Sequence, residues 1–117
     1  MTEAKKQILL VDDEAYIRKA ICRALRKLGA EFSQAESGEE ALALLQKQPF
    51  DLMITDYQMP GMTGLELIAK TKEIYPDMPI ILVSGNLQAN QAPIGIIFLP
   101  KPWPDNALEN AVSQLMG

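Results

Sequence analysis

Short apolar runs alternate along this chain with segments in which apolar residues recur every three or four positions. Such runs are typical of strands buried in a sheet, and the wider spacing is typical of amphipathic helices. The pattern predicts strands at residues 7–11, 30–34, 50–55, 79–83 and 95–99, of which the second is the weakest. It predicts helices over residues 14–28, 38–48 and 63–75, and a last helix whose first turn holds Pro104.

The ends of the expected helices carry capping residues. Four apolar residues share one face of the first helix, which Gly29 closes: Ile17, Ile21, Leu25 and Leu28. The second and third helices each begin with a capping box, in which Ser or Thr is followed three positions later by Glu. These signals support the three helices independently of their apolar spacing.

Strands that alternate with single helices imply parallel βαβ units joined by right-handed crossovers. The expected fold is therefore a flavodoxin-like, doubly wound α/β structure with a five-stranded parallel sheet in the order 2-1-3-4-5. Residues 85–94 interrupt this pattern, because a helix is due there but only ten residues are available and Pro93 lies near the end. We expect the fourth helix to be truncated or absent.

Length and composition restrict the class of protein. The 117 residues suit a single domain, 1–117, and 48% apolar with 22% charged residues is typical of a globular protein. The apolar runs are far shorter than the roughly 20 residues that span a bilayer, so we expect no membrane insertion and a cytoplasmic location. A net charge of −4 with scattered basic residues argues against direct nucleic-acid binding.

Two residue types narrow the chemistry. The single cysteine, Cys22, lies at helical spacing among apolar residues and is interpreted as core filling. The chain has no histidine, which excludes Ser-His and Cys-His catalysis, zinc sites that use histidine, and a phosphohistidine carrier. Carboxylates, hydroxyls and lysine remain.

Polar residues follow the expected strands at their carboxyl ends. Asp12 and Asp13 follow the first strand, Asp56 the third, Ser84 the fourth and Lys101 the fifth. Ligands of open α/β sheets bind beyond these ends, where the winding reverses. In the order 2-1-3-4-5 the first and third strands are neighbours. The three carboxylates are therefore expected to converge, beside one hydroxyl and one ammonium.

Three converging carboxylates repel one another by several kcal/mol for each close pair, at an effective dielectric constant of about 20. A divalent cation would relieve that repulsion. The ligands on offer are hard oxygens, which suit Mg²⁺ and, as a second possibility, Mn²⁺. Lys101 and Ser84 are suited to contact phosphoryl oxygens.

The ordered set of motifs resembles the receiver domain of two-component response regulators over the whole chain. The matching segments are VDDE at 11–14, DYQMPGMTG at 56–64, VSG at 83–85 and FLPKP at 98–102. Each segment alone is common, but the four in this order are specific. The resemblance implies that Asp56 accepts a phosphoryl group from a histidine kinase or a phosphotransfer protein.

The resemblance also implies roles for the residues around Asp56. Asp13, Asp56 and the backbone carbonyl of Gln58 would ligate Mg²⁺ directly, and Asp12 would act mainly through a metal-bound water. Lys101 would pair with the bound phosphoryl group.

Further roles concern switching. By the same likeness, Ser84 would move to hydrogen-bond the phosphoryl group, and Phe98 would be the aromatic residue that turns inward with it. Gln58 and Asn86 would tune dephosphorylation. Lys101-Pro102 is a candidate cis peptide.

Simpler interpretations exist for each residue alone. Asp12 or Asp13 could cap the following helix, Asp56 and Ser84 could be turn residues, and Lys101 could be solvated. Phe98 could be core. Five such coincidences, distributed over only four strands, are together much less probable than one site.

Three other functions are alternatives to the phosphoacceptor. The short 85–94 segment motivates a binding module on the receiver scaffold that docks its partner without phosphorylation. A phosphatase with an aspartate nucleophile usually needs a second Asp two residues on, where this chain has Gln58. A nicotinamide enzyme lacks its glycine fingerprint after the first strand.

We therefore expect a signalling protein and not an enzyme in the usual sense, although slow self-catalysed phosphotransfer and dephosphorylation fit it. Its switch would change affinity for a downstream protein target. We expect no output domain after residue 117, so the protein would be a stand-alone regulator, a relay intermediate or a receiver from a hybrid kinase. It would be a monomer or a weak dimer.

Overall fold

A computed structural model describes residues 5–85, 93 and 95–116 of the chain. Five parallel strands form one sheet in the order β2-β1-β3-β4-β5, which confirms the predicted order and fold class. The strands are β1 Gln7–Val11, β2 Glu31–Ala35, β3 Leu52–Asp56, β4 Ile80–Ser84 and β5 Ile97–Pro100. The helices are α1 Ala15–Ala24, α2 Gly38–Lys47, α3 Gly64–Ile74 and α4 Ala107–Met116, with a 3₁₀ turn η1 at Arg26–Leu28.

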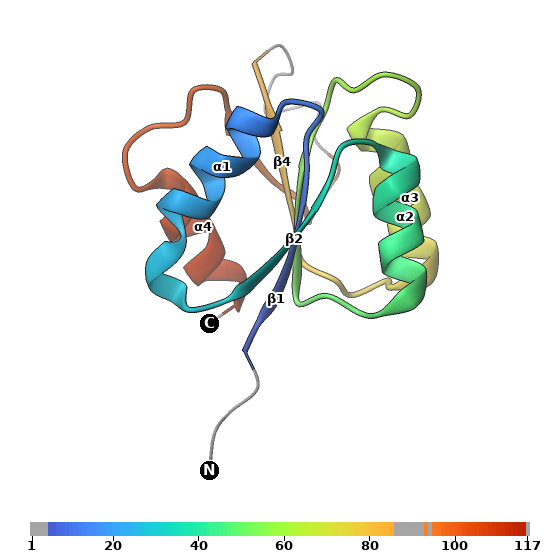
Figure 1. Cartoon of the computed structure of the whole chain (residues 1–117), viewed down its shortest axis with the longest axis horizontal. Coiled ribbons are helices and arrows are strands. Elements are labelled where there is room, and N and C mark those ends of the chain that lie inside the picture. Colours follow the sequence, from blue (N-terminus) through green and yellow to red (C-terminus); the bar gives the residue numbers. More distant parts are fainter. Residues whose placement is uncertain (1–4, 86–92, 94, 117) are drawn as a thin grey trace.

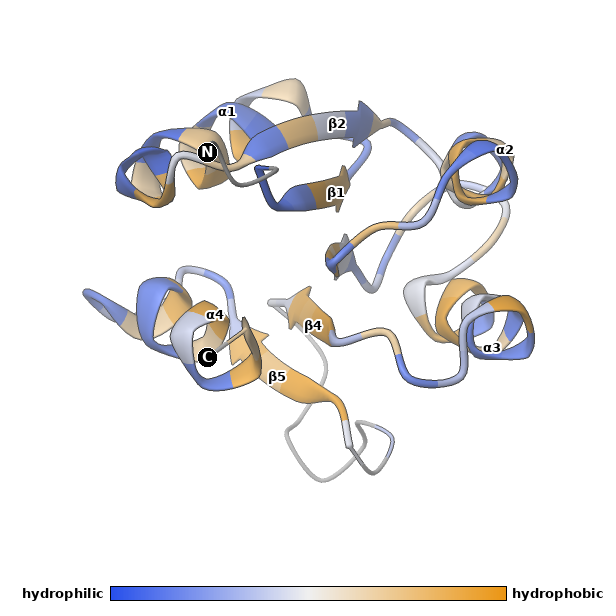
Figure 2. Ribbon diagram, turned by 90° about the horizontal axis from the view of Figure 1, so that it is seen from below, coloured by the Kyte–Doolittle hydropathy of each residue, from blue (hydrophilic) through white to orange (hydrophobic). Residues whose placement is uncertain are grey.

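Helices cover both faces of the sheet, with α1 and α4 on one side and α2 and α3 on the other (Figures 1 and 2). Successive side chains of a strand point to opposite faces. Along β1, Leu9 and Val11 therefore pack towards α2 and α3, whereas Ile8 and Leu10 pack towards α1 and α4. The central strands read as continuous apolar runs because both of their faces are buried.

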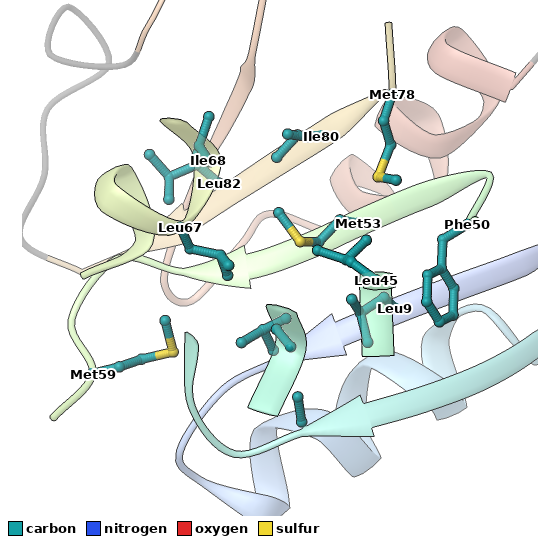
Figure 3. Packing of buried hydrophobic residues seen from close by; sticks show 13 residues of the cluster. Leu9, Leu45, Phe50, Met53, Met59, Leu67, Ile68, Met78, Ile80 and Leu82 are labelled. Carbon is teal, nitrogen blue, oxygen red and sulfur yellow. The ribbon is translucent and has the colours of Figure 1, made fainter. Parts of the chain in front are cut away.

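Two apolar clusters result, one on each side of the sheet. Figure 3 shows the cluster beneath α2 and α3, in which Leu45 and Leu67 of the helices belong to the same cluster as the strand residues Leu9, Met53 and Leu82. The opposite cluster joins residues of α1 and α4 to the other face of the strands. Cys22 is half-buried against this second cluster, as the core interpretation requires. No helix of the described residues is long and apolar enough to cross a membrane.

The first helix differs from its prediction at its carboxyl end. It ends at Ala24, and the chain continues as η1 to Gly29, whose left-handed conformation (φ 68°) is the predicted stop. Leu25, between the two, has φ −101° and ψ 11°. Because the helical phase is lost at this residue, Leu28 turns outward and is 46% exposed, so its predicted place in the core was wrong.

The last helix begins later than predicted. Pro104 lies outside it, and the helix starts at Ala107. Asn106 has a positive φ of 66°, which is incompatible with the right-handed helix but tolerated by asparagine. The prediction for the fourth helix concerns residues 85–94, of which the structure describes only Gly85 and Pro93.

Candidate functional site

The predicted acidic residues meet at the carboxyl edge of the sheet. Asp56 is the last residue of β3 and pairs in register with Val83 of β4. Asp12 and Asp13 follow β1, the neighbour of β3. One carboxylate oxygen from each of the three aspartates lies within 4.8 Å of the others. The predicted convergence is therefore present, formed by two strands that are adjacent in the sheet but 40 residues apart in sequence.

The three carboxylates differ in how far water reaches them. Asp12 is 2% exposed and Asp56 is 6% exposed, whereas Asp13 is on the surface. Oδ1 of Asp12 accepts a hydrogen bond from the backbone N–H of Glu14 (2.9 Å), and Oδ2 accepts one from Lys101 (2.9 Å). Asp12 thus has both carboxylate oxygens engaged within the protein.

Lys101 joins two of the carboxylates. Its Nζ lies 2.9 Å from Oδ2 of Asp12 and 3.2 Å from Oδ1 of Asp56. Burial alone would lower the pKa of Lys101, but hydrogen bonding and attraction from Asp12 and Asp56 outweigh it and raise the pKa. The ammonium therefore stays charged at neutral pH, and it partly balances the acidic cluster.

Asp56 is held at its Oδ1, which also accepts a hydrogen bond from the backbone N–H of Tyr57 (2.9 Å). Its pKa is raised, first by burial and then by the charge of Asp12, against the opposing influence of Lys101 and Tyr57. Burial and the neighbouring Asp12 make the charged form of Asp56 less favourable. A bound cation or a covalent bond to the carboxylate would relieve this cost.

An open cleft of about 610 Å³ lies over this cluster. Asp13, Asp56, Ser84 and Lys101 all contribute to its wall. The remaining lining residues come from the segments that follow β1 and β3: Glu14, Tyr57, Gln58, Met59, Pro60 and Thr63. The cleft brings together the three predicted chemical groups, namely carboxylate, hydroxyl and ammonium, beside Gln58.

The predicted switch residues lie on adjacent strands. Ser84 ends β4 and is 2% exposed, and Phe98 in β5 is half-buried against the cluster beneath α2 and α3. Phe98 pairs in register with Leu82, and Ser84 pairs with Pro100. The Lys101-Pro102 peptide is cis, as the resemblance implied. Asn86, predicted to tune dephosphorylation, lies outside the described residues.

Gly64 is a part of the site to which sequence reasoning gave no role. The first residue of α3, it is buried, and its backbone N–H donates to the carbonyl of Tyr57 (2.7 Å). A Cβ added here would lie 2.2 Å from the carbonyl oxygen of Asp56 and 2.9 Å from Cα of Tyr57. Helix α3 therefore packs against the backbone of Asp56 and Tyr57 at a distance that only glycine permits.

Arg18 is the second residue that sequence reasoning missed. It is 7% exposed and donates a hydrogen bond from Nη1 to the backbone carbonyl of Asp12. A signal was available, because Arg18 shares a helical face with Ile21 and Leu25, both buried. A cation on an apolar face needs a polar partner.

The raised pKa of Asp56 leads to a stability prediction. In a chelator, the Asp56→Asn variant is expected to be more stable than the unaltered protein at pH 7, because the amide removes a buried charge that lies beside Asp12. The folded pKa lies above the ordinary value of 3.8. The protonated carboxyl of Asp56 therefore favours the folded state fully below the ordinary pKa, and this contribution is lost as pH rises through the folded pKa. Urea unfolding at pH 7 and at about pH 3.5 measures both states.

The advantage of the variant should disappear at the lower pH, where Asp56 is protonated and no longer carries the charge that the amide removes. An equal difference between the two proteins at both pH values would contradict the electrostatic explanation.

Comparison with known proteins adds a family model described as the response regulator receiver domain, which matches residues 8–113. The chain is 33% identical to the response regulator receiver protein CpdR of Brucella abortus, over 95% of this chain and 97% of that protein. It is 31% identical to the chemotaxis protein CheY of Pseudomonas aeruginosa, over 93% and 94%. The sensor protein EvgS of Escherichia coli is 36% identical over 95% of this chain, which covers 10% of that protein.

Solved structures give the same likeness. The chemotaxis protein CheY4 of Vibrio cholerae superposes with a TM-score of 0.86 at 30% identity, covering 96% of this chain and 99% of that one. The receiver domain of the hybrid histidine kinase CckA superposes with a TM-score of 0.81 at 34% identity, covering 95% and 99%.

Proposed function

The chain belongs to the response regulator receiver family, and from that premise we propose that Asp56 is the residue on which it accepts a phosphoryl group. One observation carries the choice of Asp56. It lines the cleft beside Lys101, whereas Asp12 is 2% exposed with both carboxylate oxygens in hydrogen bonds. Asp13 also lines the cleft but is exposed after the end of β1, so we assign it to holding a cation.

The proposed step is an in-line displacement at phosphorus. A carboxylate oxygen of Asp56 forms a bond to the phosphorus of a donor phosphohistidine, the P–N bond breaks, and the donor imidazole leaves with the electron pair. Lys101 is within reach of an oxygen on the transferred group, since its Nζ already lies 3.2 Å from Asp56. The hydroxyl of Ser84, on the wall of the same cleft, supplies a second contact.

The donor set fits a hard divalent cation. Three carboxylate oxygens lie within 4.8 Å of one another, beside the segment of Gln58. Asp13, Asp56 and the Gln58 carbonyl would hold Mg²⁺, or Mn²⁺ in its place, and Asp12 would contribute through a water. Such an ion supplies charge neutralisation to the phosphoryl oxygens.

The proposed partners follow from this chemistry. A histidine kinase or a phosphotransfer protein donates the phosphoryl group, and a downstream protein reads the result. Phosphorylation adds about −1.5 to −2 charges at the edge of the sheet. We propose that this local change is transmitted through Ser84 and Phe98, whose strands are paired.

Metal removal provides the direct test of the proposal. Incubation with Mg²⁺ and a small phosphodonor is expected to add the mass of one phosphoryl group, measured on the intact protein. The same incubation in EDTA is expected to reduce the phosphorylated fraction at least about tenfold, because the repulsion among the acidic groups is no longer neutralised. Absence of any mass gain with Mg²⁺ would refute the phosphoacceptor proposal and favour a binding module that acts without phosphorylation.

A further inference from the structure

Arg18 is a buried cation close to the acidic cluster. On α1, it is 7% exposed, and a guanidinium removed from water costs several kcal/mol unless its donors find acceptors. Nη1 donates to the backbone carbonyl of Asp12 and Nε donates to Oε1 of Gln34 (2.9 Å). Nη2 lies 3.9 Å from Oε1 of Glu36, a side chain that is 71% exposed. The pair with Glu36 is too exposed to contribute much, so the contacts with Asp12 and Gln34 account for the position of Arg18.

The hydrogen bond from Arg18 is one of several that hold Asp12 in place. Its backbone N–H donates to the carbonyl of Ala35 in β2 (3.1 Å), and its backbone carbonyl accepts from Arg18. Its side chain accepts from Glu14 and Lys101. Glu14 and Lys101 line the cleft, whereas Arg18 acts on Asp12 through the main chain and also contacts Gln34 at the carboxyl end of β2.

The carbonyl of Asp12 belongs to the peptide that leads into Asp13. A peptide unit is planar, so a donor that fixes the direction of this carbonyl also fixes the direction in which the backbone enters Asp13. Asp13 is exposed. Its position over the cleft therefore depends on the orientation of the preceding peptide more than on side-chain packing.

We propose that Arg18 is a positioning residue for the cation site: through the Asp12–Asp13 peptide it holds the two carboxylates in place before the cation arrives. The inference rests on the proposed Mg²⁺-dependent function and adds a residue to it. Partners that orient metal ligands from behind typically contribute 10–100-fold to metal affinity. The planar fork of arginine suits this role, because one side chain reaches two acceptors at fixed angles.

The charge of Arg18 and its positioning of the carboxylates would have opposite effects on Mg²⁺ affinity, so a measurement of that affinity separates the two roles. As a cation, Arg18 repels Mg²⁺, so removal of its charge alone would tighten binding. As a positioning residue, its removal would weaken binding. A purely structural role would lower the stability of the protein and leave the Mg²⁺ affinity of the folded protein unchanged.

The experiment measures Mg²⁺ affinity by isothermal titration calorimetry on Arg18→Met, below its melting temperature. The expected result is affinity about tenfold weaker than that of the unaltered protein. The matched control is Arg23→Met, since Arg23 is an exposed arginine of the same helix, and its affinity should stay within about twofold. Unchanged affinity in Arg18→Met, or tighter binding, would overturn the inference.

Two milder variants keep the test decisive if Arg18→Met does not fold. Arg18→Lys keeps the charge but loses the fork, and Gln34→Ala removes the acceptor of Nε. Each should weaken Mg²⁺ binding severalfold, and native affinity in both would overturn the inference. If the unaltered protein bound no Mg²⁺ and gained no phosphoryl mass, the proposed function would fail instead.

Discussion

Replacing Asp56 by Asn is expected to reduce phosphoryl acceptance by at least about a thousandfold. The amide has the shape of the carboxylate but no negative charge, so its carbonyl oxygen is a much weaker nucleophile towards phosphorus. Its nitrogen is also a poor nucleophile, because the lone pair is delocalised into the carbonyl. Lys101 would keep its hydrogen bond to Asp12, and the cleft should retain its form. The measurement is the intact mass of the variant after incubation with Mg²⁺ and a small phosphodonor.

Two further variants make the result specific. Asp77→Asn changes an exposed carboxylate outside the cleft and should accept at the native rate. Asp13→Asn should slow acceptance through weaker cation binding while leaving the acceptor intact, so higher Mg²⁺ should partly restore its rate. A phosphoryl mass gain of native size in Asp56→Asn would mean that another residue is the acceptor.

Gly64→Ala is expected to have the largest effect on stability, a loss of about 3 kcal/mol. The new Cβ would lie 2.2 Å from the carbonyl oxygen of Asp56. Because that atom belongs to the backbone of β3, no side-chain rotation can relieve the overlap. Either α3 or the backbone at Asp56 and Tyr57 must shift. Urea unfolding measured by circular dichroism gives the free energy of unfolding.

The matched control for this substitution is Gly85→Ala. A Cβ at Gly85 would meet its nearest atoms, the backbone oxygen and Cβ of Lys101, at 3.7 and 3.9 Å. These are ordinary van der Waals distances, so a change of less than about 1 kcal/mol is expected. Equal losses in the two variants would show that the close approach of α3 to Asp56 is not what Gly64 provides.

The sheet could be predicted from the sequence because burial on both faces leaves a strong signal. Strands such as Ile80–Ser84 are apolar at every position before their last residue, and the alternation with helices predicts a parallel, doubly wound sheet. The order 2-1-3-4-5 was expected as the flavodoxin-like order of such sheets. Helix ends were harder to predict. Leu28 and Pro104 were misplaced because the backbone conformations at Leu25 and Asn106, which end one helix and delay another, leave no mark in apolar spacing.

The residues of the site also differ in whether the sequence alone could predict their roles. Asp12, Asp13, Asp56, Ser84 and Lys101 could be found because strand ends in a parallel sheet lie along one edge. Gly64 and Arg18 could not be assigned a role, since each depends on a distance between elements. The roles are the approach of α3 to β3 for the first and the reach from α1 to the carbonyl of Asp12 for the second.

The ammonium of Lys101 contacts both Asp12 and Asp56, so it would compete with a divalent cation for these two carboxylates. It holds part of the negative charge that a divalent ion would otherwise neutralise, and a flexible four-carbon chain keeps it tethered in the cleft. A divalent ion bound at Asp56 would compete with this ammonium for the same carboxylate, so the affinity for the ion would depend on the strength of the Lys101–Asp56 contact. A lysine that gave up its contact with Asp56 would still be close enough to pair with an oxygen of a phosphoryl group carried by Asp56.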